Sequence, residues 1–189
     1  MIEKGVMYFF TGLAGAGKTT IGGLFYEHLK AVKPDAILLD GDKQRSIVGQ
    51  KIATPADMVS APTDAGYFQQ DDDRLYSTEA RKRGALETAA FCRELVNSGK
   101  DVVLCTISMY KEVRSWYREN VEKYVEIYIC VKRETLYQRN QKGLYSPGRR
   151  NVVGVDLPWD EPRTPDIVIH NDGQQTPEEI VRDLIQKLL

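Results

Sequence analysis

Short apolar runs alternate along the chain with longer segments in which apolar residues recur at helical spacing. The apolar runs predict strands over Val6–Thr11, Ala36–Leu39, Val102–Ile107, Val125–Val131 and Ile167–Ile169. Most of these runs are nearly continuous rather than alternating, as is typical of parallel strands covered on both faces.

The segments between the strands predict helices over 18–32, 76–98, 110–122, 134–141 and 177–188. The last begins with Thr176-Pro177-Glu178-Glu179, which offers a capping hydroxyl, a proline in the first turn and early acidic residues. Alternating strands and helices imply right-handed crossovers and an α/β sandwich. With 189 residues, the chain suits a single domain, residues 1–189.

Two segments lack clear periodicity, 46–73 and 143–165. Loops of this length inside a compact domain usually cover a functional site or are disordered. The second contains "NQKGLYSPGRRN", which we expect to form a mobile cover that closes over the site and excludes water.

Charge and cysteine content narrow the function classes. Lys and Arg total 26 against 27 Asp and Glu, so no global field draws the chain to nucleic acid or anionic lipid. No apolar run approaches the roughly 18 residues of a membrane span. Cys92, Cys105 and Cys130 form no paired motif, which indicates reduced thiols in a cytoplasmic protein. Any affinity for phosphate must therefore come from a local site.

The stretch "TGLAGAGKTT", residues 11–20, provides such a site. It fits G-x-x-x-x-G-K-[ST] and lies between a predicted strand and a predicted helix, which is the context that this phosphate-binding motif requires. Bare backbone lets amides approach a triphosphate, and the helix adds its positive end. A chance glycine-rich turn is the alternative. We expect ATP to be bound by Gly12, Gly15, Ala16, Gly17, Lys18, Thr19 and Thr20, with Thr19 offering its hydroxyl to Mg²⁺.

A second motif, "ILLDGDKQR", follows at residues 37–45. Asp40 ends an apolar strand, and ligands of open α/β sheets lie beyond the carboxyl ends of the strands. Of Asp40 and Asp42, one is expected to accept a proton from an attacking hydroxyl and the other to help hold Mg²⁺. Arg45 is placed to bind a second anion. The alternative is an ordinary Asp/Gly turn. No guanine-reading N/T-K-x-D element is present, which favours transfer to an acceptor over a GTPase switch.

Taken together, "GLAGAGKTT", "LDGDKQR", "TISMYKEVR", "RNQKGLY" and "NVVGVDLPWDEPRTPDIVI" resemble the adenylyl-sulfate (APS) kinases, from about residue 5 to residue 189. The resemblance implies a P-loop NTPase-type parallel five-stranded sheet flanked by helices, usually in a homodimer. It also implies transfer of the γ-phosphoryl group of MgATP to the ribose 3′-hydroxyl of a small nucleotide.

The resemblance assigns roles to individual residues. Asp40 resembles the base, Asp42 a metal or substrate contact, and Arg45 a contact to the phosphate-sulfate part of the substrate. Arg81 is one candidate, with Asp73, Arg74 and Arg83, for a substrate-binding signature of the family whose asparagine is missing here. With Lys18, these residues would form much of the reaction site.

Further positions match the family beyond the third strand. Ile107 and Ser108 lie in the substrate-binding "ISP" segment. Lys142 matches a lysine near the reacting phosphates, and Leu144 lies on the same cover. Arg139 matches an arginine that packs on the adenine of ATP.

The departures from the family pattern all fall on the acceptor side. Met109 replaces a proline, and Val152-Val153-Gly154 replaces a segment whose phenylalanine stacks on the adenine of APS. We therefore expect Val152 and Gly154 to line the acceptor pocket without such stacking. The acceptor expected first is adenylyl sulfate, with a role in sulfate assimilation. The alternative is cytidine diphosphoramidate, because the segments "TISM" and "NVVGVD" also resemble relatives found with bacterial capsule genes. A non-catalytic nucleotide-binding module is a further alternative.

Overall fold

A computed structural model describes residues 3–41 and 78–189 and shows a parallel sheet. The strands are β1 (Met7–Thr11), β2 (Ile37–Asp40), β3 (Val102–Cys105), β4 (Tyr124–Cys130) and β5 (Ile167–His170). Their order is β2-β3-β1-β4-β5, with every neighbouring pair parallel. The predicted α/β architecture is confirmed, and all five carboxyl ends meet at one edge.

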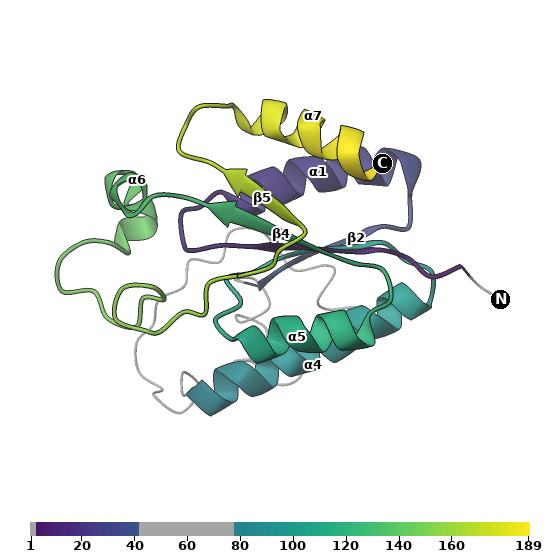
Figure 1. The fold of residues 1–189 in the computed structure, drawn as a ribbon, viewed down its shortest axis with the longest axis horizontal. Coiled ribbons are helices and arrows are strands. Elements are labelled where there is room, and N and C mark those ends of the chain that lie inside the picture. The colour runs from purple at the N-terminus through teal and green to yellow at the C-terminus, as the bar shows by residue number, and fades with distance from the viewer. Residues whose placement is uncertain (1–2, 42–77) are drawn as a thin grey trace.

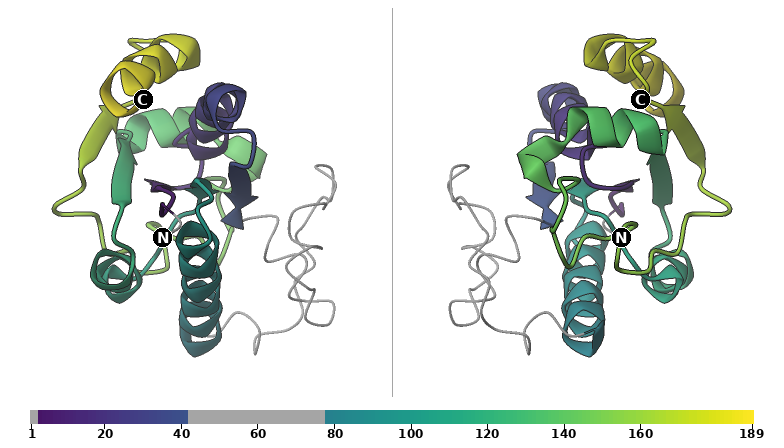
Figure 2. Two further views of the ribbon diagram at one scale, coloured as in Figure 1. Left: turned by 90° about the vertical axis from the view of Figure 1, so that its right-hand side faces the viewer. Right: turned by 90° about the vertical axis from the view of Figure 1, so that its left-hand side faces the viewer.

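Helices cover both faces of this sheet (Figure 1). They are α1 (Lys18–Val32), α4 (Thr78–Asn97), α5 (Lys111–Asn120), α6 (Arg133–Arg139) and α7 (Pro177–Leu188). In Figure 1, α1 and α7 lie on one face, whereas α4 and α5 lie on the other. The two turned views in Figure 2 show the same layers along the strands.

The middle strand β1 explains why its sequence is apolar at every position. Tyr8 and Phe10 belong to the core beneath α1 and α7, and Met7 and Phe9 belong to the core beneath α4 and α5. All four side chains are buried. Each buried aromatic or Met side chain contributes about 1.5–3 kcal/mol. A strand covered on both faces has no side for polar residues.

The predicted element bounds are largely confirmed, and the differences have local causes. Thr176 caps α7 with a reciprocal capping box to Glu179. The helix predicted over 134–141 ends at Arg139, because Asn140 adopts a left-handed conformation with φ 35° before a short turn, η1 (Gln141–Gly143). The strand predicted over Val102–Ile107 ends at Cys105. The start predicted at residue 76 for α4 lies outside the described residues, as does the segment 46–73.

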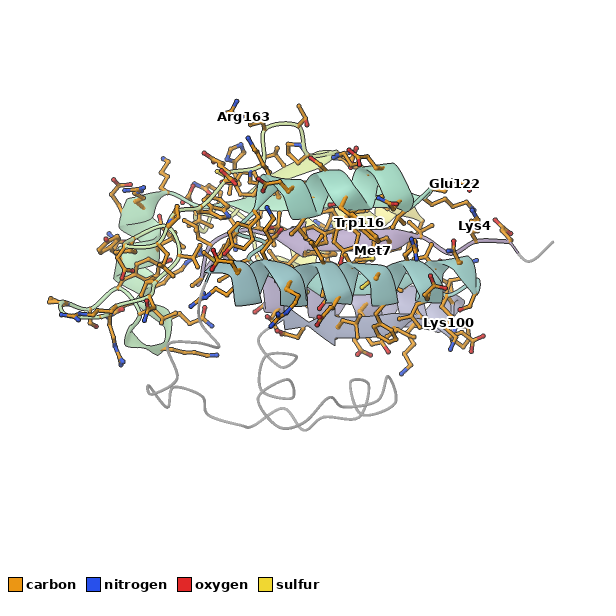
Figure 3. The ribbon with its side chains drawn as sticks, turned by 90° about the horizontal axis from the view of Figure 1, so that it is seen from below. Lys4, Met7, Lys100, Trp116, Glu122 and Arg163 are labelled. Atoms are coloured by element: carbon orange, nitrogen blue, oxygen red, sulfur yellow. The ribbon has the colours of Figure 1, made fainter. Side chains whose placement is uncertain are left out.

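The thiols match the prediction, because Cys92 and Cys105 are free and buried and Cys130 is free and half-buried. In the described part of the chain, no helix combines the length and apolar character needed to cross a membrane. At the amino ends of the strands, Lys4 Nζ pairs with Glu122 Oε2 at 2.8 Å. Figure 3 labels both, together with Met7 on β1, and shows this ion pair at the end of the sheet opposite the segment that contains α6.

Candidate active site

The loop between β1 and α1 has a backbone that favours glycine. Gly12, Gly15 and Gly17 have φ values of 148°, 77° and 100°, in the region that side-chain-bearing residues rarely adopt. A Cβ on Gly12 would lie 2.5 Å from the Ile129 carbonyl oxygen. Ala16 is buried, and Thr20 is exposed on the first turn of α1. The predicted phosphate-binding loop is thus a fixed backbone shape between a buried strand and a helix N-terminus.

Side chains hold the carbonyl oxygens of residues 13–16, which belong to this loop. The donors, in chain order of the acceptor, are Lys18 Nζ (2.9 Å), Tyr145 Oη (2.7 Å), Arg139 Nη1 (3.2 Å) and Asn171 Nδ2 (2.8 Å). Sequence reasoning selected Lys18 and Arg139 but missed the other two. Asn171 does carry a signal, because it is a polar residue directly after a strand, at the edge where ligands bind.

Asp40 lies across the site from the loop, at the end of β2. Its Oδ2 accepts a hydrogen bond from Thr19 Oγ1 at 2.9 Å. A hydroxyl and a carboxylate oxygen at this separation are the hard donors that Mg²⁺ prefers, so the residues fit a magnesium ion. Asp42 and Arg45, predicted to act beside Asp40, lie outside the described residues.

The segment after β3 is held in the same manner as the phosphate-binding loop. The carbonyl oxygen of Ile107 accepts from Thr11 Oγ1 (2.7 Å), that of Ser108 from Arg114 Nη1 (2.8 Å), and that of Met109 from the Asp160 amide (3.0 Å). Ser108 has φ 48°, a strained conformation for serine. Strain that is held by hydrogen bonds from three other segments is a feature of functional sites.

Arg81 reaches this segment from α4. Its Nη1 lies 3.7 Å from Met109 Sδ, within the range of a weak hydrogen bond to sulfur. The two residues that sequence analysis placed on the acceptor side are therefore in contact. Met109 is one of the departures from the family pattern. The proline that it replaces has no sulfur atom, so it could not make this contact with Arg81.

Arg114 connects the Ser108 carbonyl to a buried carboxylate on β4. Its Nε lies 3.3 Å from Glu126 Oε1, and both side chains are at least 93% buried. Burial lowers the pKa of Arg114 and raises that of Glu126, while the opposite charge of each partner acts against these shifts. Arg118 pairs with the second oxygen of Glu126 at 3.1 Å and with Asp166. This ion-pair network fixes α5 and the chain before β5 around the segment 107–109.

Asn140 organises the segment 140–146, which begins the stretch predicted to cover the site. Its Oδ1 accepts from the Tyr145 amide at 2.9 Å, and its Nδ2 donates to Ser146 Oγ at 2.8 Å. Lys142 is exposed with φ 55°, and Leu144 is half-buried. This segment therefore has a defined turn in which Lys142 remains accessible.

Val152 and Gly154, predicted to line the acceptor pocket, lie in a tight turn. The Val152 side chain is 5% exposed, and its amide donates to Asp156 Oδ1 at 2.6 Å. Gly154 has φ 83°, and a Cβ there would lie 2.7 Å from Leu13 Cδ2. Gly154 thus packs closely against the phosphate-binding loop. A larger side chain at this position would displace Leu13.

Comparison with known proteins agrees with this geometry. The sequence profile of the adenylylsulphate kinase family matches residues 4–56 and 69–170. The chain belongs to this family. It is 38% identical over 182 residues to a cytidine diphosphoramidate kinase of Campylobacter jejuni, across 94% of this chain and 93% of that protein. It is 30% identical over 192 residues to an adenylyl-sulfate kinase of a Picosynechococcus species, across 100% of this chain and 96% of that protein.

A solved structure shares the fold. The Mycobacterium tuberculosis APS kinase CysC, in complex with AMPPNP and APS, superposes with a TM-score of 0.74 at 21% identity, across 98% of each chain. The predicted P-loop NTPase-type sheet is thereby confirmed. Because its relatives are named kinases, this APS-kinase-family chain is a phosphotransferase.

Proposed function

We propose that this kinase transfers the γ-phosphoryl group of MgATP to the ribose 3′-hydroxyl of cytidine diphosphoramidate. The 38% identity to the Campylobacter jejuni enzyme, across nearly the full length of both chains, carries the choice of acceptor. The adenylyl-sulfate kinase of Picosynechococcus is less similar, at 30% identity. This proposal reverses the order expected from the sequence, in which adenylyl sulfate came first.

The donor side is supported by the phosphate-binding loop. Amides of the loop and the N-terminus of α1 would bind the β- and γ-phosphates of ATP. Lys18, which donates to the Leu13 carbonyl in this structure, would exchange that carbonyl for a phosphate oxygen. The Thr19 hydroxyl would hold Mg²⁺, which neutralises phosphate charge when bound.

The transfer itself needs alignment and one proton acceptor. The acceptor oxygen forms a bond to the γ-phosphorus as the bond to the ADP oxygen breaks, and the hydroxyl proton passes to a carboxylate. Asp40 accepts a hydrogen bond from Thr19, directly after the loop, and we assign it this role. Lys142 would offset charge on the transferred group from the cover, where its side chain is accessible.

The acceptor side supports a base other than adenine. Val152 is buried in its turn and, as a valine, has no aromatic ring that could stack on a purine. Met109, in contact with Arg81, replaces a rigid proline with a flexible thioether that can pack on a smaller pyrimidine. Both residues are departures from the APS-kinase pattern.

The same resemblance leads us to propose a homodimer that acts in the cytoplasm on a small nucleotide rather than on nucleic acid. Sedimentation equilibrium of the purified protein tests the dimer. A monomer at concentrations that support full activity would contradict it.

Acceptor-dependent formation of ADP tests the reaction. The purified enzyme and its Asp40→Asn variant are assayed with MgATP and either cytidine diphosphoramidate or adenylyl sulfate. We expect rapid turnover of the cytidine compound by the natural enzyme, and little by the variant. Turnover of adenylyl sulfate alone would restore the acceptor expected first. If no ADP forms with either acceptor, the result would favour the non-catalytic nucleotide-binding module.

A further inference from the structure

The phosphate-binding loop is held from outside by two side chains that sequence reasoning did not select. Tyr145 Oη donates to the Ala14 carbonyl at 2.7 Å, and Asn171 Nδ2 donates to the Ala16 carbonyl at 2.8 Å. The two donors come from different segments, one from the cover after α6 and the other from the turn after β5.

Peptide planarity makes these bonds relevant to the ligand. In a trans peptide the C=O and the following N–H point in opposite directions. The carbonyl of Ala14 shares its peptide with the amide of Gly15, and the carbonyl of Ala16 shares its peptide with the amide of Gly17. A donor that fixes the carbonyl on the outer side of the loop therefore fixes the amide on the inner side.

Glycine makes such fixing necessary. Gly15 and Gly17 have φ values of 77° and 100°, and the freedom that permits these values also permits rotation of the adjoining peptides. Donors already aimed at the place where charge must be bound avoid reorganisation on binding. A loop without outer hydrogen bonds would have to order these peptides each time a phosphate enters.

We propose that Tyr145 and Asn171 are positioning residues that hold the Gly15 and Gly17 amides toward the phosphates of the bound nucleotide. This inference rests on the proposed function, since it requires ATP in this loop. It adds a role for the cover and for the turn after β5 that is separate from choice of acceptor.

Tyr145 is well placed for this role. Its side chain is buried, its amide is held by Asn140 Oδ1, and its ring lies 5.0 Å from that of Tyr137. Burial, with a smaller effect of Tyr137, raises the pKa of Tyr145 to about 12, so its hydroxyl keeps the proton that it donates. The cover that presents Lys142 is thus joined to the loop by one hydroxyl group.

Asn171 is fixed by the sheet. Its amide donates to the Cys130 carbonyl at 3.0 Å, at the end of β4, and its own carbonyl accepts from Arg139 Nη2 at 2.7 Å. A Cβ on Gly17 would lie 2.7 Å from Asn171 Nδ2, which shows how closely the amide group packs on the loop. The Asn171 side chain therefore holds Gly17 in a fixed position relative to the ends of the strands.

Direct ATP binding tests the proposal without any acceptor. Tyr145→Phe and Asn171→Ala are each compared with the natural enzyme by isothermal titration with MgATP. Tyr137→Phe is the matched control, because it removes a hydroxyl from the neighbouring exposed ring. We expect Kd to rise about three- to ten-fold in each of the two variants and to stay within about two-fold in the control.

Steady-state kinetics separate positioning from general stability. The KM of ATP should rise in Tyr145→Phe and Asn171→Ala, while the KM of the acceptor and the midpoint of thermal unfolding stay close to those of the natural enzyme. Unchanged ATP affinity in both variants would overturn the proposal. Equal rises in both KM values with a lower unfolding midpoint would show a structural role and would also overturn it. Failure of the natural enzyme to bind ATP would instead refute the proposed function, and this inference with it.

Discussion

Thr19 Oγ1 donates a hydrogen bond to Asp40 Oδ2 across 2.9 Å, and this bond joins the first turn of α1 to the last residue of β2. The strands β2 and β1 are separated in the sheet by β3, so the two residues come together only at the carboxyl edge. The bond places the expected metal-binding hydroxyl and the expected proton acceptor within one site. It also makes Asp40 the residue whose replacement is most informative.

Asp40→Asn should lower kcat by roughly 10²–10⁴-fold, because the amide cannot accept the hydroxyl proton. ATP affinity should change less than kcat, since the loop and Lys18 remain. Asp35→Asn, an exposed acid just before β2, is the control and should retain activity. Pure Asp40→Asn enzyme with near-natural kcat would remove Asp40 from the proton transfer.

Lys18→Ala should lower kcat/KM for ATP by at least about 10²-fold, because a cation aimed at developing phosphate charge is lost. Lys33→Ala removes a charge at the opposite end of α1 and serves as the control. Initial rates over a range of ATP concentrations measure both effects. Equal kcat/KM in the two variants would show that Lys18 does not contact the nucleotide phosphates.

Arg114→Ala should destabilise the protein by about 3–5 kcal/mol, because it leaves the buried Glu126 carboxylate with less compensation. It also removes the donor to the Ser108 carbonyl, so kcat/KM for the acceptor should fall on the order of 10²-fold. Urea unfolding and kinetics at low temperature measure the two effects separately.

Lys4→Ala is the control for this variant, because it breaks the exposed pair with Glu122 at the far end of the sheet (Figure 3). Exposed pairs add little to stability, so the free energy of unfolding should be nearly unchanged. A loss in Arg114→Ala no larger than in Lys4→Ala would contradict the account of the buried network.

Tyr8 gives a prediction for alkaline pH. Burial, with the negative charge of Asp101, raises the pKa of Tyr8 to about 12, above its ordinary value of 10.0. A raised pKa of the folded state means that the stabilising effect is complete below pH 10 and is lost as pH rises toward 12. Between about pH 9 and about pH 11, the natural protein should lose about 1 kcal/mol more stability than Tyr8→Phe. Urea unfolding across this range measures the difference, and parallel curves would contradict it.

The order of strands and helices was predictable because each apolar run can be recognised from neighbouring residues in the sequence. The run Met7–Thr11 is continuous because both faces of β1 are covered, and the run can be seen in the order of the residues alone. The glycines of the phosphate-binding loop were also predictable, since backbone shape and motif spacing coincide. The helix predicted over 134–141 ends early at Asn140, because the left-handed conformation of Asn140 depends on the turn that follows.

The side-chain donors around the loops could not be predicted, because they arrive from distant segments. Asn171 is 155 residues from Ala16 in the chain, and Tyr145 is 131 residues from Ala14. Glu126 lies inside the apolar strand β4 and is buried only because Arg114 and Arg118 on α5 face it. An acid within an otherwise apolar strand was the signal available, but it does not name its partners.

The most direct test of the central claim is a competition between the two acceptors. Equal concentrations of cytidine diphosphoramidate and adenylyl sulfate share one reaction with limiting MgATP, and mass spectrometry measures the two phosphorylated products over time. The ratio of products gives the ratio of kcat/KM values. We predict that the phosphorylated cytidine compound predominates. Predominance of phosphorylated adenylyl sulfate would contradict the proposed acceptor.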